Sequence, residues 1–404
     1  MKARLSLVLA LVAVSAVTAG AASSGRWSPA EAHRVSLVVS PSTVLLDQAV
    51  EVRVSGLRPG QKVTLEAATR DVLGARWRSH VVFRANGAGT VDTHRHMRLF
   101  WAMEPLRKTA LAAPFIPSVG PTPVTIRAVI AGRTVATGAL VRRGAAPDIS
   151  RKDTSLATQG FIGAYFARPP GPPGPAVLQL GGALGSYGYF PAALLATHGY
   201  PTLSLAYFKE PGLPATLKDV PLEYFAKALR WLAAQPGVDP NRVLVYGVSR
   251  GAEAGLLTGA TYPGLVHGVI ASSPGGDVVG AFPGPGAAWT FGGKAVPNGP
   301  IPVWQIGGPV LAFGGGKDLY WPSAYYVGEI VERARDHGRS DIAGRVYPDA
   351  GHGVGFGIPN LPAYGRVVKL GNHYIGVGGT TGANVRAWEA SWPLVLRFIR
   401  TLPG

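Results

Sequence analysis

The sequence predicts an α/β domain, with a mostly parallel sheet and helices on both faces, preceded by an antiparallel β-sandwich. Short runs of alternating apolar and polar residues fill the first third of the chain, and apolar strands followed by helical patterns fill the rest. The chain has 404 residues, 47% of them hydrophobic, and no long polar tract. It is long enough for two domains with separate cores.

The N-terminus has the composition of an export signal. Lys2 and Arg4 introduce an apolar stretch over residues 5–17, and small residues near 17–21 offer cleavage sites. As a helix this stretch would rise about 20 Å, too little for a hydrocarbon core of roughly 30 Å. We expect residues 1–22 to be a signal peptide and the mature protein to be exported without a membrane span. An uncleaved anchor is the alternative, and the protein would be cytoplasmic if the leader does not function.

Residues 33–143 are expected to form the sandwich. Turn signals such as 57–60 and 86–89 separate runs of alternating polarity at a spacing typical of immunoglobulin-like sandwiches. Most of the net charge of +17 lies in this half of the chain. Its arginines are scattered along the strands without interleaved aromatic residues, which predicts solvated strand faces and no nucleic-acid partner. The arginines concerned are Arg53, Arg70, Arg76, Arg78 and Arg84.

A polar stretch, residues 144–160, is expected to be a linker. The α/β domain is then expected over residues 161–404, with 161–169 as an edge strand. A proline-rich turn within 171–182 is expected to lead into a buried strand, and the other expected strands are 200–208, 242–247, 265–274, 308–316 and 343–350. The expected helices are 189–199, one that begins at 222 and is stopped by Pro236-Gly237, 250–261, 323–338 and 384–402. Apolar strands that alternate with helices are typical of a parallel sheet covered on both faces.

One pentapeptide, Gly247-Val-Ser249-Arg-Gly251, stands between an apolar strand pattern and a helical one. In that context it predicts the nucleophile elbow of α/β hydrolases, a strained strand-to-helix turn that raises the serine hydroxyl above the sheet. A side chain at either glycine would collide with neighbouring elements. Ser249 is therefore the predicted nucleophile, and an ordinary glycine-rich loop is the alternative.

An acid and then a histidine should follow the serine, each after a later strand. Asp318 lies just beyond one apolar strand, and His352 lies beyond the next in a glycine-rich loop. The histidine would take the serine proton, and the carboxylate would fix the imidazole tautomer. Asp277 is the rival acid and His373 the rival base.

An oxyanion hole needs two backbone N–H donors. Arg250, directly after the nucleophile, would supply one, and the loop 180–188 would supply the other. In this loop Gly182 allows the backbone to approach the substrate, and Ala183 is the expected donor. The loop could instead cradle a phosphate, although it lacks the lysine of a P-loop.

Longer stretches resemble the family of acyl-CoA thioesterases and bile acid-CoA:amino acid N-acyltransferases. They include "SPSTVLLDQAVEVRVSGLRPGQKVTLEA", "LPATLKDVPLEYFAKALRWLAAQPGVDPNRVLVYGVSRGAEAGLL", "YPDAGHG" and "GGTTGANVRAWEASWPLVLRF". The resemblance implies a β-sandwich followed by an α/β hydrolase domain. It also implies Ser249 as nucleophile, Asp318 as acid and His352 as base.

The resemblance implies a small-molecule acyl thioester or ester as substrate, acyl-CoA among them. Conjugating members of the family carry cysteine where this chain has Ser249, which favours hydrolysis over transfer. The leader is a second departure, because acyl-CoA is an intracellular metabolite. If CoA is the donor, Arg250 and Lys317 are expected to meet its phosphates at the pocket mouth. Residues 280–300 are expected to border the acyl pocket.

Three function classes stay open: a serine thioesterase or esterase, an acyltransferase using the same residues, and a non-catalytic exported binding protein. The chain has no cysteine, which excludes disulfides and thiolate ligands. It also has no histidine–carboxylate cluster typical of metal sites, so no metal and no cofactor are expected.

Overall fold

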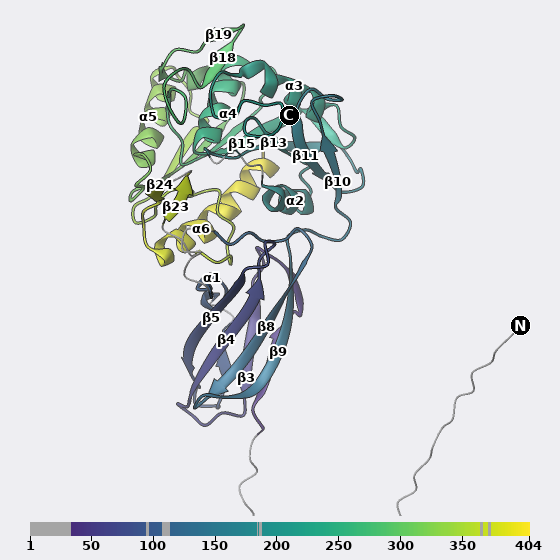
Figure 1. Ribbon diagram of the computed structural model, residues 1–404, viewed down its shortest axis with the longest axis vertical. Helices are drawn as coiled ribbons and strands as arrows, with labels where there is room; N and C mark the ends of the chain where they lie inside the picture. The colour runs from purple at the N-terminus through teal and green to yellow at the C-terminus, as the bar shows by residue number, and fades with distance from the viewer. Residues whose placement is uncertain are drawn as a thin grey trace, which may run out of the picture. The chain divides into compact units, whose positions relative to one another are not determined.

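Two sheets packed face to face form the first domain of the computed structural model (Figure 1). The structure describes residues 34–93, 97–106, 114–183, 185, 188–363, 367–370 and 373–404, so the expected signal peptide, residues 1–22, lies outside the described residues. In spatial order one sheet contains β1 (Ser36–Ser40), β3 (Glu51–Ser55) and β6 (Val91–Asp92). The other contains β2 (Thr43–Leu45), β9 (Arg133–Arg143), β8 (Pro121–Ile130), β4 (Lys62–Arg70), β5 (Arg76–Arg84) and β7 (Glu104–Pro105), and the short helix α1 (Arg98–Trp101) precedes β7.

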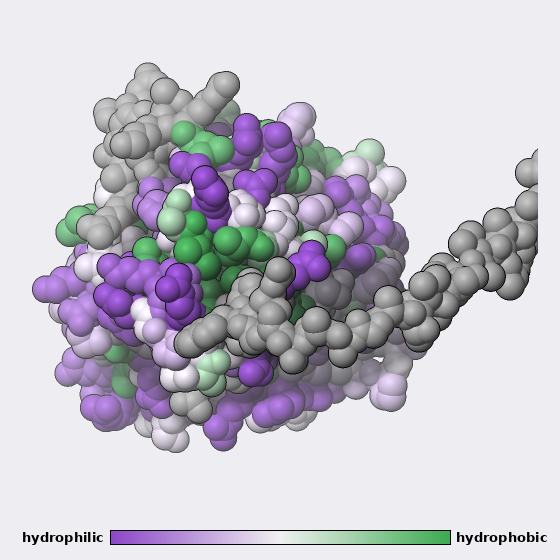
Figure 2. Space-filling model, turned by 90° about the horizontal axis from the view of Figure 1, so that it is seen from below, coloured by the Kyte–Doolittle hydropathy of each residue, from purple (hydrophilic) through white to green (hydrophobic). Residues whose placement is uncertain are grey.

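The alternating pattern has the expected effect on the sandwich. In β4, Val63 and Leu65 are buried in the same core as Val52 and Val54 of β3. The five scattered arginines of the strands are all exposed. Figure 2 shows hydrophilic side chains over most of the face seen from below, with hydrophobic side chains gathered near its middle. One pairing is not antiparallel as expected, because β2 runs parallel to β9.

The stretch expected to be a linker contains a strand. Residues Ser150–Thr154 form β10, the edge strand of the second domain's sheet, and pair with β11 (Ile162–Ala167). The expectation that 161–169 is the edge strand is therefore wrong, because β11 lies between β10 and β13. Four of the five β10 side chains are exposed, so hydrophobic periodicity carries no signal for this strand.

The second domain is built on one mixed sheet covered by helices. Beyond β10 and β11, the sheet continues with β13 (Thr202–Ala206), β12 (Gly174–Leu180), β15 (Val238–Val248), β16 (Val269–Ser272), β21 (Val310–Gly315) and β22 (Ile342–Tyr347). The strands from β13 to β22 are parallel to one another. The helices are α2 (Tyr189–Thr197), α3 (Leu222–Ala233), α4 (Arg250–Thr261), α5 (Ser323–Asp336) and α6 (Thr381–Arg400).

Successive residues of the central strands enter two different cores. Val245 packs with the helices α3, α4 and α5 on one face. Its neighbours Leu244 and Tyr246 pack with α2 and α6 on the other. This is the doubly covered parallel sheet that uniformly apolar strands predict. In the part of the chain that the structure describes, no helix combines the length and the apolar character needed to cross a membrane.

Residues 273–309, between β16 and β21, form an irregular segment that we call the cap segment. It contains β17 (Asp277–Val278), β18 (Trp289–Phe291), β19 (Lys294–Ala295), β20 (Gly299–Pro300) and the 3-10 helix η2 (Val303–Gln305). β17 pairs with β20, and β18 pairs with β14 (Val220–Pro221). Glycine and proline dominate this sequence, so its short strands carry no periodic signal.

Polar contacts fasten the sandwich to the α/β domain. The Asp47 carboxylate accepts hydrogen bonds from Trp392 Nε1 of α6 at 2.9 Å and lies 2.6 Å from His198 Nε2 at the end of α2. Arg142 of β9 is buried and donates to the carbonyl of Asn360, 2.9 Å away. Burial lowers the pKa of Arg142 to about 10, and the nearby Asp47 opposes that shift.

Candidate active site

The candidate residues lie at one edge of the parallel sheet. Val248 of β15 stands opposite Ser272 of β16, which stands opposite Phe313 of β21. The carboxyl ends of parallel strands meet at one edge, so the loops that carry Ser249, Asp318 and His352 emerge side by side. This edge is where open α/β sheets bind ligands.

Ser249 occupies the strained turn that the pentapeptide predicts. It joins the last residue of β15 to the first of α4 with φ 58° and ψ −122°, a backbone conformation that residues with a side chain rarely adopt. A Cβ on Gly247 would collide with the Gly251 carbonyl, and one on Gly251 would collide with the Gly181 carbonyl. The flanking glycines are therefore required by close backbone packing.

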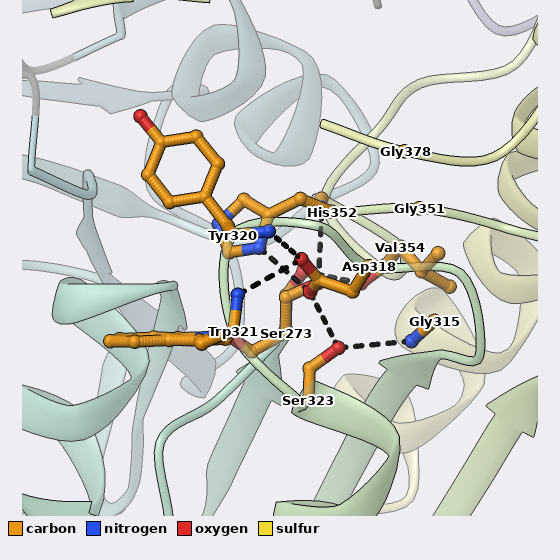
Figure 3. Close-up of polar contacts among 12 residues, drawn as sticks. Ser273, Gly315, Asp318, Tyr320, Trp321, Ser323, Gly351, His352, Val354 and Gly378 are labelled. Carbon is orange, nitrogen blue, oxygen red and sulfur yellow. Dashed lines mark hydrogen bonds and ion pairs between the residues drawn. The ribbon is translucent and has the colours of Figure 1, made fainter. Parts of the chain in front are cut away.

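Asp318 and His352 are joined directly (Figure 3). His352 Nδ1 lies 2.8 Å from Asp318 Oδ2, and the Asp318 side chain is fully buried. The other carboxylate oxygen accepts the backbone N–H of Tyr320 at 2.9 Å, and the Ser323 hydroxyl donates to Oδ2 at 2.6 Å. The Tyr320 ring stacks on the His352 ring at a centroid distance of 4.8 Å. This arrangement fixes both the carboxylate and the plane of the imidazole.

The histidine loop is tied to the strand next to the nucleophile. Gly353 N–H donates to Ser273 Oγ at 2.8 Å, and Ser249 N–H donates to the carbonyl of Ser272 at 2.9 Å. Ser272 and Ser273 thus hold the serine turn and the histidine loop at the same end of β16. Among the described side chains no hydrogen bond joins Ser249 Oγ to His352, and such contacts are often long in ligand-free sites.

The rival residues lie elsewhere. Asp277 pairs with Arg333 of α5, with 2.8 Å between Asp277 Oδ1 and Arg333 Nη2. His373 belongs to β24 (His373–Gly376), which pairs with β23 (Val367–Leu370) outside the main sheet. The residues that the structure describes contain no group of three or more histidine and acidic side chains placed to hold a metal ion.

The loop expected to complete an oxyanion hole lies against the serine. A Cβ on Gly182 would come within 3.2 Å of Ser249 Cβ and 3.7 Å of its Oγ. Ala183, half-buried, directly follows Gly182, and Arg250, the other expected donor, is the first residue of helix α4. The backbone of this loop is thus within reach of a carbonyl held at Ser249.

Tyr207 is a functional candidate that sequence reasoning missed. Its hydroxyl donates to the Gly181 carbonyl at 2.6 Å, and burial raises the pKa of the phenol. The tyrosine lies just beyond β13, 26 positions from its partner, so no local pattern marks it. Its hydrogen bond fixes the residue before Gly182 and so positions the loop.

Tyr207→Phe is expected to lower kcat roughly three- to tenfold with little change in KM, because one net hydrogen bond is worth about 1 kcal/mol. Steady-state kinetics on an acyl ester that the wild-type protein hydrolyses measures both constants. Tyr224→Phe is the matched control. The Tyr224 hydroxyl donates to the Ala206 carbonyl at 2.7 Å, and this hydrogen bond does not involve the loop beside the serine. Equal losses of kcat in both variants would contradict a positioning role for Tyr207.

The Arg250 side chain was expected at the pocket mouth, and this prediction is wrong. It is buried and pairs with Glu253, with 2.7 Å between Nη1 and Oε2. Its Nη2 donates to the carbonyls of Val279 and Gly280 at 2.8 Å each, and Glu253 Oε1 accepts from Trp289 Nε1 at 2.8 Å. Burial raises the pKa of Glu253 to about 7, while Arg250 opposes that shift. Glu253 and the two carbonyls supply the partners that a buried charge requires, so the Arg250 side chain can lie in the interior. Its position in the sequence did not indicate this.

Lys317 is exposed, next to the buried Asp318. Together with Leu319 it lines an open pocket of about 710 Å³, and the exposed Arg386 of α6 lines the same pocket. The other residues lining it are Asp349, Gly376, Gly378, Gly379, Thr380 and Ala383. Arg386 is a second cation at this pocket that the sequence did not single out.

Comparisons with known proteins agree along most of the chain. The family model "Acyl-CoA thioester hydrolase/BAAT N-terminal region" matches residues 47–155, and "BAAT / Acyl-CoA thioester hydrolase C terminal" matches 220–281 and 291–402. Acyl-coenzyme A amino acid N-acyltransferase 2 of Rattus norvegicus is 30% identical over 79% of this chain and 86% of that protein. Acyl-coenzyme A thioesterase 1 of Rattus norvegicus is 28% identical over 84% and 87%. Among solved structures, the thermophilic carboxylesterase EstE1 from a metagenomic library superimposes with a TM-score of 0.42 at 15% identity, over 64% of this chain and 90% of that one.

Proposed function

Because the chain belongs to the acyl-CoA thioester hydrolase/BAAT family, we propose that it hydrolyses acyl thioesters through an acyl-enzyme on Ser249. Membership makes it an enzyme of the hydrolase or acyltransferase type. The observation that carries the serine mechanism is the hydrogen-bonded pair of Asp318 and His352 at the same sheet edge as the strained Ser249 turn.

In the proposed reaction Ser249 Oγ attacks the thioester carbonyl while His352 Nε2 takes the hydroxyl proton. The N–H groups of Arg250 and Ala183 stabilise the oxyanion. When the C–S bond breaks, His352 returns the proton to the leaving thiol, and the acyl group remains on Ser249. Water then attacks the ester while His352 takes a proton from it, the bond to Ser249 Oγ breaks, His352 returns the proton to Oγ, and a carboxylic acid is released. Asp318 holds the Nδ1–H tautomer throughout.

A panel of acyl donors tests this function. Acyl-CoA, a simple ester and an amide with the same acyl chain are offered with and without glycine or taurine, and products are identified by mass spectrometry. Free acid from the thioester is expected, with no rise in conjugate when amine is added. Conjugate as the main product would replace hydrolysis with acyl transfer, and turnover of the ester alone would point to a carboxylesterase.

We also propose that Lys317 and Arg386 meet the phosphates of a CoA donor. Salt screens such contacts over roughly 10 Å at 0.1 M, so KM for acyl-CoA is expected to rise several-fold between low and high ionic strength. KM for a neutral ester with the same acyl chain should barely change. Lys317→Ala and Arg386→Ala should flatten the salt response, whereas the exposed sandwich residue Arg53→Ala should leave it intact. Identical salt responses for the two substrates would exclude CoA recognition by charge.

Export remains a proposal that rests on residues 1–22. Expressed with its leader in a bacterial host, the protein is expected outside the cytoplasm and shortened by about 19–22 residues. Cell fractionation and mass measurement of the intact protein check both points. Full-length protein confined to the cytosol would refute export and strengthen the case for acyl-CoA as substrate.

A further inference from the structure

The cap segment is held to the residue next to the nucleophile by a buried ion pair. Val279 is bound at both backbone polar atoms: its N–H donates to Glu253 Oε1 at 2.9 Å, and its carbonyl accepts from Arg250 Nη2 at 2.8 Å. Arg250 and Glu253 in turn pair with each other at 2.7 Å, and the carboxylate is fully buried.

Residues 275–279 contact one neighbour of the base and one neighbour of the nucleophile. At one end, a Cβ on Gly275 would contact the Trp321 ring at 3.7 Å, and that ring lies 6.1 Å from the His352 ring between centroids. At the other end, Val279 is bonded to Arg250, the neighbour of Ser249 in the chain. This strip therefore lies between a residue packed near the His352 ring and the side chain of the residue after Ser249.

The Val279 side chain is left open while its backbone is fixed. It is 40% exposed, although Val278 beside it is 5% exposed and packed in the core. A single exposed apolar side chain is unremarkable in itself. Here its backbone is held by the side chain of Arg250, the residue after the nucleophile, and a fixed backbone is the preorganisation that a specificity contact requires.

We propose that Val279 contacts the acyl chain of the substrate and selects for its length, and that Arg250 and Glu253 are the positioning residues that hold it there. This rests on the proposed serine acyl-transfer chemistry at Ser249. The ion pair fixes the backbone of the glycine-rich cap segment at Val279, which would form one wall of the acyl site. The part of the acyl chain beyond the carbonyl would pass along that wall.

Two small substitutions test the contact. Val279→Thr keeps the shape and replaces a methyl group with a hydroxyl, and Val279→Ala removes the contact. Both are expected to lower the ratio of kcat/KM for p-nitrophenyl octanoate to that for p-nitrophenyl acetate, about three- to tenfold and mainly through KM. Val82→Thr, at a valine 59% exposed on the sandwich, is the matched control and should leave the ratio unchanged.

The ion pair is tested separately. Glu253→Gln alone leaves a buried arginine without its counter-charge and can prevent folding. The double variant Arg250→Met/Glu253→Gln removes both charges. The amide oxygen of the new glutamine can still accept hydrogen bonds from the Val279 N–H and from Trp289 Nε1. The double variant is expected to lower the octanoate-to-acetate ratio in the same direction as Val279→Thr. An unchanged ratio in the folded double variant would overturn the positioning role.

The same ratio measured on octanoyl-CoA and acetyl-CoA separates this inference from the proposed function. If wild type turns over the thioesters but the ratio is unchanged in both Val279 variants, the specificity role is wrong and the proposed function stands. If only the esters are turned over and their ratio falls, the specificity role stands and the thioesterase function is wrong. Failure of every substrate, together with no labelling by octyl or methyl phosphonate probes, would overturn both.

Discussion

Ser249→Ala is expected to lower kcat by about four to six orders of magnitude and to abolish covalent labelling by an active-site phosphonate. The alanine keeps the Cβ, so the strained turn at φ 58° and its glycine neighbours are undisturbed. Only the hydroxyl that would form the acyl-enzyme is lost. Intact-protein mass spectrometry after phosphonate treatment and steady-state kinetics on an acyl ester measure the two effects.

Ser204→Ala provides the control for losing a buried serine hydroxyl. Ser204 is fully buried in β13, and its hydroxyl has no hydrogen-bond partner among the described residues. Its replacement is expected to preserve labelling and turnover. Full labelling of Ser249→Ala would move the nucleophile to another residue.

Asp318→Asn is expected to reduce kcat by roughly four orders of magnitude, the effect of the same change in a serine protease. The backbone N–H groups of Tyr320 and Trp321 both point at Oδ1, so the asparagine should place its carbonyl there. Its NH₂ group would then face His352 Nδ1 and force the proton onto Nε2. An imidazole in that tautomer cannot accept the serine proton.

Asp277→Asn discriminates between the two candidate acids. Asp277 is paired with Arg333, and its loss is expected to cost less than tenfold in kcat. Circular dichroism of both variants checks that each is folded. A larger loss of kcat in Asp277→Asn than in Asp318→Asn would reverse the assignment of the acid.

The features visible in the sequence are those set by local pattern. The strand–turn–helix context around Ser249 and the alternation of apolar strands and helices were sufficient for the fold class, because they depend on short-range periodicity and steric need. The same logic placed Asp318 and His352 in loops that parallel strands bring to one edge. The structure then brings these two side chains within 2.8 Å.

What the sequence hid depends on long-range contacts. β10 is polar and exposed because it is an edge strand, and only its pairing with β11 identifies it. The Arg250 side chain was expected at the pocket mouth to meet the phosphates of CoA, but Glu253 one turn along α4 and two carbonyls of the cap segment hold it in the interior. The role of Tyr207 depends on one hydrogen bond to a backbone carbonyl 26 positions away in the chain, and hydrophobic periodicity gives no information about such a contact.

The contacts of Asp47 and Arg142 make the sandwich part of the catalytic domain's own scaffold. Leu46 packs in the same core as α2, α6 and the strand residue Tyr246, just before the serine turn. A chain cut between the domains would leave that core open and the indole N–H of Trp392 without its carboxylate. Heat should therefore unfold both domains in one cooperative transition. Substitutions in β2 or β9 would then change the unfolding temperature of the whole enzyme and not that of the sandwich alone.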